Sequence, residues 1–134
     1  MAKKTIVVIE DDANYRDVLR EVLEDAGYDV IAVGDAADAL SQLSHGIDLV
    51  LLDLIMPRAV MDGFTFLAEA RARPNLLNTP VIVLSGLGEA VLDAIDPATA
   101  SALRIVSVIP KPAVLTDLLS AVLAALEPGV PGGA

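Results

Sequence analysis

Short hydrophobic runs alternate along the chain with segments in which hydrophobic positions repeat at helical spacing. The runs predict five strands, at Thr5–Glu10, Asp29–Val33, Asp48–Leu52, Pro80–Leu84 and Arg104–Ile109. Continuous runs of Val, Ile and Leu are typical of strands that are buried on both faces of a parallel sheet. The alternation of such strands with helical segments therefore predicts an α/β domain.

Helical periodicity marks five segments between and after these strands. The first carries its hydrophobic face on Tyr15, Val18, Leu19, Val22, Leu23 and Ala26, and the others are Ala36–Leu43, Gly63–Arg73, Leu87–Leu103 and Leu115–Leu126. We expect Gly27 to end the first helix in a left-handed conformation. We expect Asp96-Pro97 to break the fourth, because an interior proline removes a backbone hydrogen bond.

The predicted architecture is a doubly wound, flavodoxin-like sheet of five parallel strands in the order 2-1-3-4-5, with five helices. Residues 4–127 form this domain, and residues 128–134 are expected to be a flexible tail. The fifth strand lies at an edge of the sheet, where Pro110 is acceptable. The first and third strands are neighbours at the topological switch point, where such folds bind ligands.

Polar residues follow the carboxyl ends of four strands. Asp11 and Asp12 follow the first strand, Asp53 the third, Ser85 the fourth and Lys111 the fifth. Because parallel strands end at one edge of the sheet, we expect these side chains to converge. Two carboxylates about 4 Å apart repel by roughly 4 kcal/mol at an effective dielectric near 20. Three of them therefore require either a cation or raised pKa values.

This set of groups suits a divalent cation and a phosphoryl group. Oxygen ligands without histidine or cysteine favour Mg²⁺, which takes only one or two carboxylates. The remaining carboxylate could attack phosphorus and carry the group as an aspartyl phosphate. The cation, an ammonium group and a hydroxyl would then neutralise the transferring oxygens.

Composition narrows the classes of function. The chain is 54% hydrophobic, but no apolar run approaches the roughly 18 residues that span a bilayer. The first residues imitate a signal peptide, but the run enters Glu10-Asp11-Asp12 without a cleavage site. The net charge of −10 argues against direct nucleic-acid binding, and the absence of cysteine excludes disulfides. We therefore expect a cytoplasmic protein that binds neither membranes nor nucleic acid.

Five short motifs occur in a fixed order, at or after the carboxyl ends of the first, third, fourth and fifth strands. They are Glu10-Asp11-Asp12, Asp53 with Met56-Pro57, Met61-Asp62-Gly63, Ser85-Gly86 and Lys111-Pro112. Together they resemble the receiver domain of two-component response regulators, and the resemblance covers about residues 4–127. Each motif alone is common, whereas the ordered set is specific.

The resemblance implies a Mg²⁺-dependent phosphoryl acceptor. Asp53 would accept the phosphoryl group from a histidine kinase or a phosphotransfer protein. Asp11, Asp12, Asp53 and the backbone carbonyl of Ile55 would hold Mg²⁺. The protein would then be a stand-alone receiver that switches its binding to a downstream protein partner.

The resemblance also assigns the remaining groups. Ser85 and Lys111 would contact the phosphoryl oxygens, and the Lys111-Pro112 peptide bond would be cis. The surface around helix four, strand five and helix five would bind partners, and a homodimer could form there.

Three features depart from the family pattern. Val108 stands three residues before Lys111, where the family often has a switching Tyr or Phe. The loop at Arg58-Ala59-Val60 is longer than the common form, and so is the stretch from Ser85 to Lys111, which Pro97 interrupts.

Other interpretations remain open at this point. Taken alone, Asp11 and Asp12 could simply begin the first helix as an N-cap and a first-turn acid. His45 is interpreted as a helix-end cation rather than a phosphoryl acceptor. The chain could also be a phosphorylation-independent interaction domain. A phosphohydrolase is the weaker alternative, because such enzymes generally place a second Asp where Ile55 stands, and we therefore expect no enzyme activity.

Overall fold

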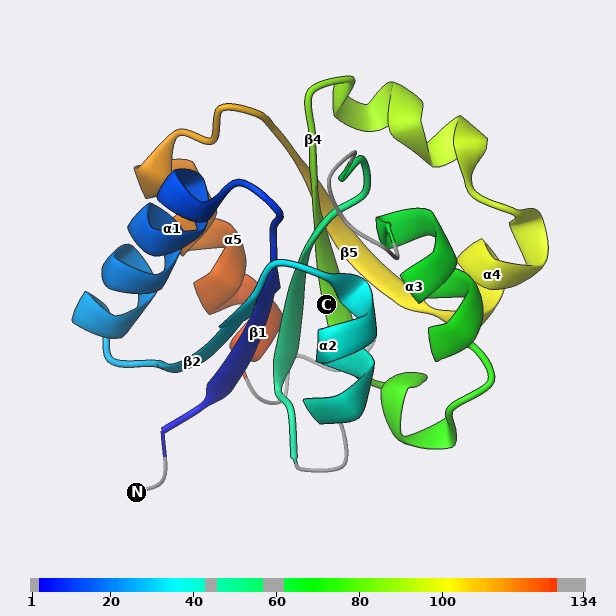
Figure 1. Ribbon diagram of the computed structural model, residues 1–134, viewed down its shortest axis with the longest axis horizontal. Helices are drawn as coiled ribbons and strands as arrows, with labels where there is room; N and C mark the ends of the chain where they lie inside the picture. Colours follow the sequence, from blue (N-terminus) through cyan, green and yellow to red (C-terminus); the bar gives the residue numbers. More distant parts are fainter. Residues whose placement is uncertain (1–2, 43–45, 57–61, 128–134) are drawn as a thin grey trace.

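The five predicted strands form one parallel sheet in the computed structural model, which describes residues 3–42, 46–56 and 62–127. The strands are β1 (Thr5–Ile9), β2 (Asp29–Val33), β3 (Leu49–Asp53), β4 (Pro80–Ser85) and β5 (Arg104–Pro110). Their order is β2-β1-β3-β4-β5, and every neighbouring pair is parallel (Figure 1). The predicted α/β fold and strand order are confirmed.

Helices follow each strand. They are α1 (Ala13–Asp25), α2 (Ala36–Gln42), α3 (Gly63–Ala70), α4 (Pro97–Ala102) and α5 (Leu115–Leu126), with 3₁₀ helices η1 (Pro74–Leu76) and η2 (Gly88–Ala94). Gly27 ends α1 with a φ of 101°, and its amide donates to the carbonyl of Glu24 at 3.0 Å. The predicted glycine stop is therefore confirmed.

The fourth helical segment consists of two separate helices, whereas the sequence predicts one helix with a break. Its first part is the 3₁₀ helix η2, and only Pro97–Ala102 is α-helical. Asp96 caps α4 by accepting a hydrogen bond from the Thr99 amide at 3.1 Å, and Pro97 occupies the first turn. A proline is favourable there because its missing N–H has no partner to lose. The predicted break at Asp96-Pro97 is confirmed, but it starts a new helix.

The sheet separates two hydrophobic cores, and alternation along β1 illustrates the division. Ile6 and Val8 pack in the core that contains buried side chains of α1 and α5. Val7 and Ile9 pack in the core that contains buried side chains of α2 and α3. Figure 1 shows α1 and α5 on one face of the sheet and α2 and α3 on the other. Because β1 and β3 are covered on both faces, they are apolar at almost every position.

The edge strand β5 delivers Lys111 to the carboxyl end of the sheet. Pro110 is its last residue and pairs with Ser85 of β4. The amide of Lys111 then donates to the Ser85 carbonyl at 3.0 Å, so the pairing continues past the proline. Pro110 is tolerated because it lies at the end of an edge strand.

Three predicted segments lie outside the described residues. They are the end of the second helix with His45, the loop at 57–61 and the tail at 128–134. In the part of the chain that is described, no helix is long and apolar enough to cross a membrane.

Gly63 allows α3 to begin directly against the end of β3. Its amide donates to the carbonyl of Leu54 at 3.1 Å. A Cβ at this position would lie 2.5 Å from both the Asp53 carbonyl oxygen and the Leu54 Cα. Both atoms belong to the backbone and cannot rotate away. The glycine therefore sets how closely the helix approaches the strand that carries Asp53.

We expect Gly63→Ala to lower the free energy of unfolding by about 1–3 kcal/mol, because the added methyl group overpacks a rigid contact. Urea unfolding measures the change. Gly46→Ala is the matched control, since a Cβ at Gly46 meets nothing within 4 Å. Equal stability of the two variants would contradict the proposed close approach.

Candidate functional site

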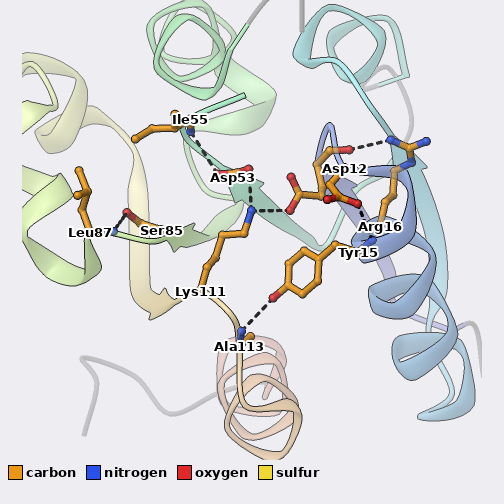
Figure 2. A network of polar contacts seen from close by, with 10 residues as sticks. Asp12, Tyr15, Arg16, Asp53, Ile55, Ser85, Leu87, Lys111 and Ala113 are labelled. Atoms are coloured by element: carbon orange, nitrogen blue, oxygen red, sulfur yellow. Dashed lines mark hydrogen bonds and ion pairs between the residues drawn. The ribbon is translucent and has the colours of Figure 1, made fainter. Parts of the chain in front are cut away.

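Asp53 ends β3 as a buried carboxylate, with only 3% of the residue exposed. Its Oδ1 accepts a hydrogen bond from the Ile55 amide at 3.2 Å, and its Oδ2 accepts one from Lys111 Nζ at 3.0 Å (Figure 2). A buried carboxylate is costly unless it is paired. The Ile55 amide and the Lys111 ammonium each donate to one of its two oxygens, so both oxygens are paired.

Lys111 connects two acidic side chains at the carboxyl ends of different strands. Its Nζ contacts Asp53 Oδ2 at 3.0 Å and Glu10 Oε1 at 2.6 Å. Burial opposes the charge on the ammonium group, but the hydrogen bonds to Glu10 and Asp53 outweigh it and raise the pKa of Lys111. The ammonium therefore stays charged and links the ends of β1, β3 and β5.

Glu10 is a further functional candidate, to which the sequence pattern alone assigns no role. It is fully buried directly after β1, and its amide donates to the Val33 carbonyl at 3.0 Å. Burial, reinforced by the nearby Asp53 carboxylate, raises the pKa of Glu10 to about 7 although Lys111 lowers it. Its Oε2 has no hydrogen-bond partner among the described residues. The signal in the sequence was a charged residue continuing a buried strand, which is rare without a partner.

Glu10, Asp11 and Asp53 together can surround a cation. Each offers one carboxylate oxygen, and these atoms all lie within 4.8 Å of one another. Such a group of hard oxygen ligands suits Mg²⁺. The Oε2 atom of Glu10 is buried and has no hydrogen-bond donor among the described residues, so it is available to a cation or its water. The convergence of Asp11 and Asp53 agrees with the geometry expected from the strand order.

Asp12 lies outside this group of three and forms the N-cap of α1. Its Oδ1 accepts a hydrogen bond from the Tyr15 amide at 3.1 Å. One residue later, Arg16 Nη1 donates to the backbone carbonyl of Glu10 at 2.8 Å. The capping role that the sequence left open for the acidic pair is the one that Asp12 takes, and Asp11 joins the carboxylate cluster.

Ser85 is buried at the end of β4, as expected for a strand-end hydroxyl. Its Oγ accepts a hydrogen bond from the Leu87 amide at 3.0 Å and so stabilises the following turn. Figure 2 shows Ser85 on the opposite side of Asp53 from Tyr15. Ile55, whose carbonyl was expected to bind Mg²⁺, lies in the loop after Asp53 and is half exposed.

A cavity of about 280 Å³ adjoins the carboxylate cluster and is lined by Glu10, Asp12, Tyr15, Lys111 and Pro112. The Lys111-Pro112 peptide bond is cis, as the resemblance implied. The turn after β5 therefore forms one wall of the cavity, and the start of α1 forms another. This arrangement can hold a divalent cation and an anionic group beside a buried carboxylate.

The family description that matches the chain is that of a response regulator receiver domain, and the match covers residues 6–123. Among curated proteins, the chain is 38% identical over 91 residues to a probable transcriptional regulator, ycf27, of Porphyridium aerugineum. The alignment covers 66% of this chain and 35% of that protein. The chain thus spans about a third of the length of this relative.

Solved structures show the same fold. Chemotaxis protein CheY4 of Vibrio cholerae superposes with a TM-score of 0.80 at 25% identity, covering 93% of this chain and all of that chain. The receiver domain of a signal transduction histidine kinase from Syntrophus aciditrophicus gives a TM-score of 0.73 at 28% identity. That alignment covers 92% of this chain and 89% of the other.

The raised pKa of Glu10 predicts a specific dependence of stability on pH. With divalent cations chelated, the folded state holds the Glu10 proton up to about pH 7, whereas the ordinary pKa is 4.5. The contribution of Glu10 to stability is therefore full below about pH 4.5 and is lost as the pH rises through about 7. One pKa unit corresponds to about 1.4 kcal/mol, so the total loss is on the order of 3 kcal/mol.

Urea unfolding between these pH values, compared with Glu10→Gln, measures the effect. The variant should lose the part of the pH dependence that belongs to Glu10. Glu69→Gln, which changes an exposed carboxylate on α3, should keep the wild-type profile. A Glu10→Gln profile parallel to that of the wild type would show that Glu10 titrates normally.

Proposed function

Because the chain belongs to the response regulator receiver domain family, we propose that Asp53 accepts a phosphoryl group in a Mg²⁺-dependent reaction. The donor is a histidine kinase or a phosphotransfer protein, and phosphorylation changes the affinity for a downstream protein partner. The observation that carries this proposal is the shared ammonium of Lys111, which contacts the buried carboxylates of Asp53 and Glu10. The domain acts as a signalling module rather than an enzyme with turnover.

The donor set supports a Mg²⁺ site at the carboxylate cluster. Asp11 and Asp53 would bind the cation, the Ile55 carbonyl would add a ligand, and Glu10 would act directly or through water. This assignment gives Glu10 the place in the acidic pair that the sequence suggested for Asp12, because Glu10 belongs to the cluster and has an unpartnered Oε2. When bound, the cation neutralises charge on the carboxylates and on the phosphoryl oxygens.

In the transfer step, a carboxylate oxygen of Asp53 attacks the phosphorus of a phosphohistidine. The new bond joins that oxygen to phosphorus, and the phosphorus–nitrogen bond breaks. Its electron pair stays on the imidazole of the donor, which regains a proton. Lys111 is already 3.0 Å from Asp53 and can pair with a phosphoryl oxygen without moving far. Ser85 would complete the contacts by turning its hydroxyl from the Leu87 amide toward the same group.

The surface formed by β5 and α5 is the proposed route to the downstream partner. A groove of about 310 Å³ is lined there by residues that include Val108, Pro110, Pro112 and Ala121. The groove lies along β5 and includes Pro110 and Pro112, the two neighbours of Lys111 in the chain. A movement of the Lys111 backbone would therefore change the shape of the groove. A homodimer through α4, β5 and α5 stays a proposal of the same kind.

The first test is phosphorylation of Asp53 by a small phosphodonor with Mg²⁺, followed by intact-protein mass spectrometry. The wild type should gain one phosphoryl group, and Asp53→Asn should gain none because it lacks the nucleophilic carboxylate. Asp29→Asn, at the opposite end of the sheet, is the matched control and should behave as the wild type. Absence of modification in the wild type would instead favour a phosphorylation-independent interaction domain.

The second test separates the two possible acidic pairs by measuring Mg²⁺ affinity calorimetrically. Glu10→Gln and Asp11→Asn should each weaken binding by about 10- to 100-fold, as expected when a ligand or its supporting partner is lost. Asp12→Asn should have a much smaller effect, because asparagine also caps helices well and α1 is retained. A loss with Asp12→Asn as large as with Glu10→Gln would restore the pair suggested by the sequence.

A further inference from the structure

Tyr15 connects the start of α1 to the turn that carries Lys111. Its hydroxyl oxygen accepts a hydrogen bond from the backbone amide of Ala113 at 3.0 Å, and the two residues are 98 positions apart in sequence. Figure 2 shows the phenol ring of Tyr15 extending from α1 toward this amide, beside Lys111. Because Ala113 follows directly after the cis Lys111-Pro112 bond, the contact restrains the backbone two residues beyond Lys111.

The ring of Tyr15 also contacts the charged end of Lys111. The Nζ atom lies 5.1 Å from the ring centroid, within the distance at which an aromatic face attracts an ammonium group. One side chain therefore restrains both the backbone after Lys111 and its ammonium group. A lysine side chain has a flexible four-carbon stem, so its position depends on restraints of this kind.

The first turn of α1 holds Tyr15 itself in place. Asp12 Oδ1 accepts the hydrogen bond from the Tyr15 amide at 3.1 Å, and Arg16 Nη1 binds the Glu10 carbonyl at 2.8 Å. These contacts tie the start of the helix to the end of β1, where Glu10 lies. Tyr15 therefore holds Lys111 in a fixed position relative to the end of β1, where the acidic cluster begins.

From these contacts we infer that Tyr15 is a positioning residue, which holds the Lys111 ammonium where a phosphoryl group on Asp53 would meet it. The inference rests on the proposed function of Asp53 and adds a residue that acts through Lys111. Asp12 contributes to the same end by capping the helix that carries Tyr15. The alternative is that Tyr15 only fills space, since it also packs against the core between the sheet and α1 and α5.

The chain offers a matched control for that alternative. Tyr28 packs against the same hydrophobic core, but it precedes β2 at the opposite end of the sheet. The amide of its neighbour Asp29 donates a hydrogen bond to the backbone carbonyl of Lys4, which precedes β1. Tyr28→Phe therefore tests removal of a tyrosine hydroxyl away from Lys111.

The experiment compares Tyr15→Phe, Tyr15→Leu and Tyr28→Phe with the wild type. Two quantities are measured: the rate of Asp53 phosphorylation by a small phosphodonor, and the Mg²⁺ affinity. Tyr15→Phe should lower the rate by about 3- to 10-fold and Tyr15→Leu by more, because a misplaced group loses its catalytic contribution steeply. Mg²⁺ affinity should not fall, because Tyr15 acts on Lys111 and not on the ligands. Tyr28→Phe should leave both quantities unchanged.

Two outcomes would overturn the inference. One is an unchanged phosphorylation rate in both Tyr15 variants. The other is a parallel fall of the rate and the Mg²⁺ affinity, which would mean that the site has lost its structure. A general packing role does not separate the two quantities, whereas a role through Lys111 does.

A second readout needs no phosphodonor and therefore distinguishes this inference from the proposed function. NMR of the unphosphorylated protein follows hydrogen exchange of the Ala113 amide and the side-chain signals of Lys111. Tyr15→Phe should speed Ala113 exchange and shift the Lys111 signals, whereas Tyr28→Phe should do neither. Unchanged signals in Tyr15→Phe would overturn the inference even if the wild type is phosphorylated. If the wild type resists phosphorylation while Tyr15→Phe shows these changes, the proposed function alone is refuted.

Discussion

The shared ammonium of Lys111 is the interaction on which the carboxyl edge of the sheet depends. It joins Glu10 after β1 to Asp53 at the end of β3, and both acids are buried. Without a bound metal ion, neighbouring buried carboxylates repel one another and lose their hydration, which favours the protonated form of one of them even beside Lys111. Burial and the repulsion from Asp53 are the reasons why the pKa of Glu10 is raised. The order β2-β1-β3-β4-β5 brings the compensating charge from the far edge strand.

The surrounding structure keeps this ion pair in one arrangement. Gly63 lets α3 approach the backbone of Asp53, and Arg16 fastens the start of α1 to Glu10. Tyr15 spans the remaining gap to the turn after Lys111. These contacts come from α1 and α3, whereas the paired side chains follow β1, β3 and β5, so the site depends on elements from across the fold. Glu10, Asp11 and Asp53 would hold a cation beside Lys111, and its charge would add to that of the ammonium in compensating the acids.

Much of this arrangement could be predicted from the sequence because it follows from strand polarity alone. Hydrophobic runs located all five strands, and their common direction brought Asp11, Asp53 and Lys111 to one edge. The roles of Glu10 and Asp12 could not be predicted in the same way, because they depend on where β1 ends. If the end of β1 is placed one residue too late, a residue of the acidic pair is mistaken for the helix cap, or the reverse. The contact between Tyr15 and Ala113 was also hidden, since no local pattern reports a hydrogen bond between segments so far apart. The 3₁₀ helix η2 was missed because the hydrophobic spacing in so short a segment does not distinguish a 3₁₀ helix from an α-helix.

The most direct measurement is a crystal structure of the protein with Mg²⁺ and beryllofluoride, a mimic of the phosphoryl group on aspartate. We expect beryllofluoride on Asp53, with Lys111 Nζ within hydrogen-bonding distance of a fluoride. We also expect Mg²⁺ held by Asp11 and Asp53, with Glu10 beside it and Asp12 still capping α1. A cation bound by Asp12, or a Lys111 side chain directed away from Asp53, would refute the proposed arrangement of the site.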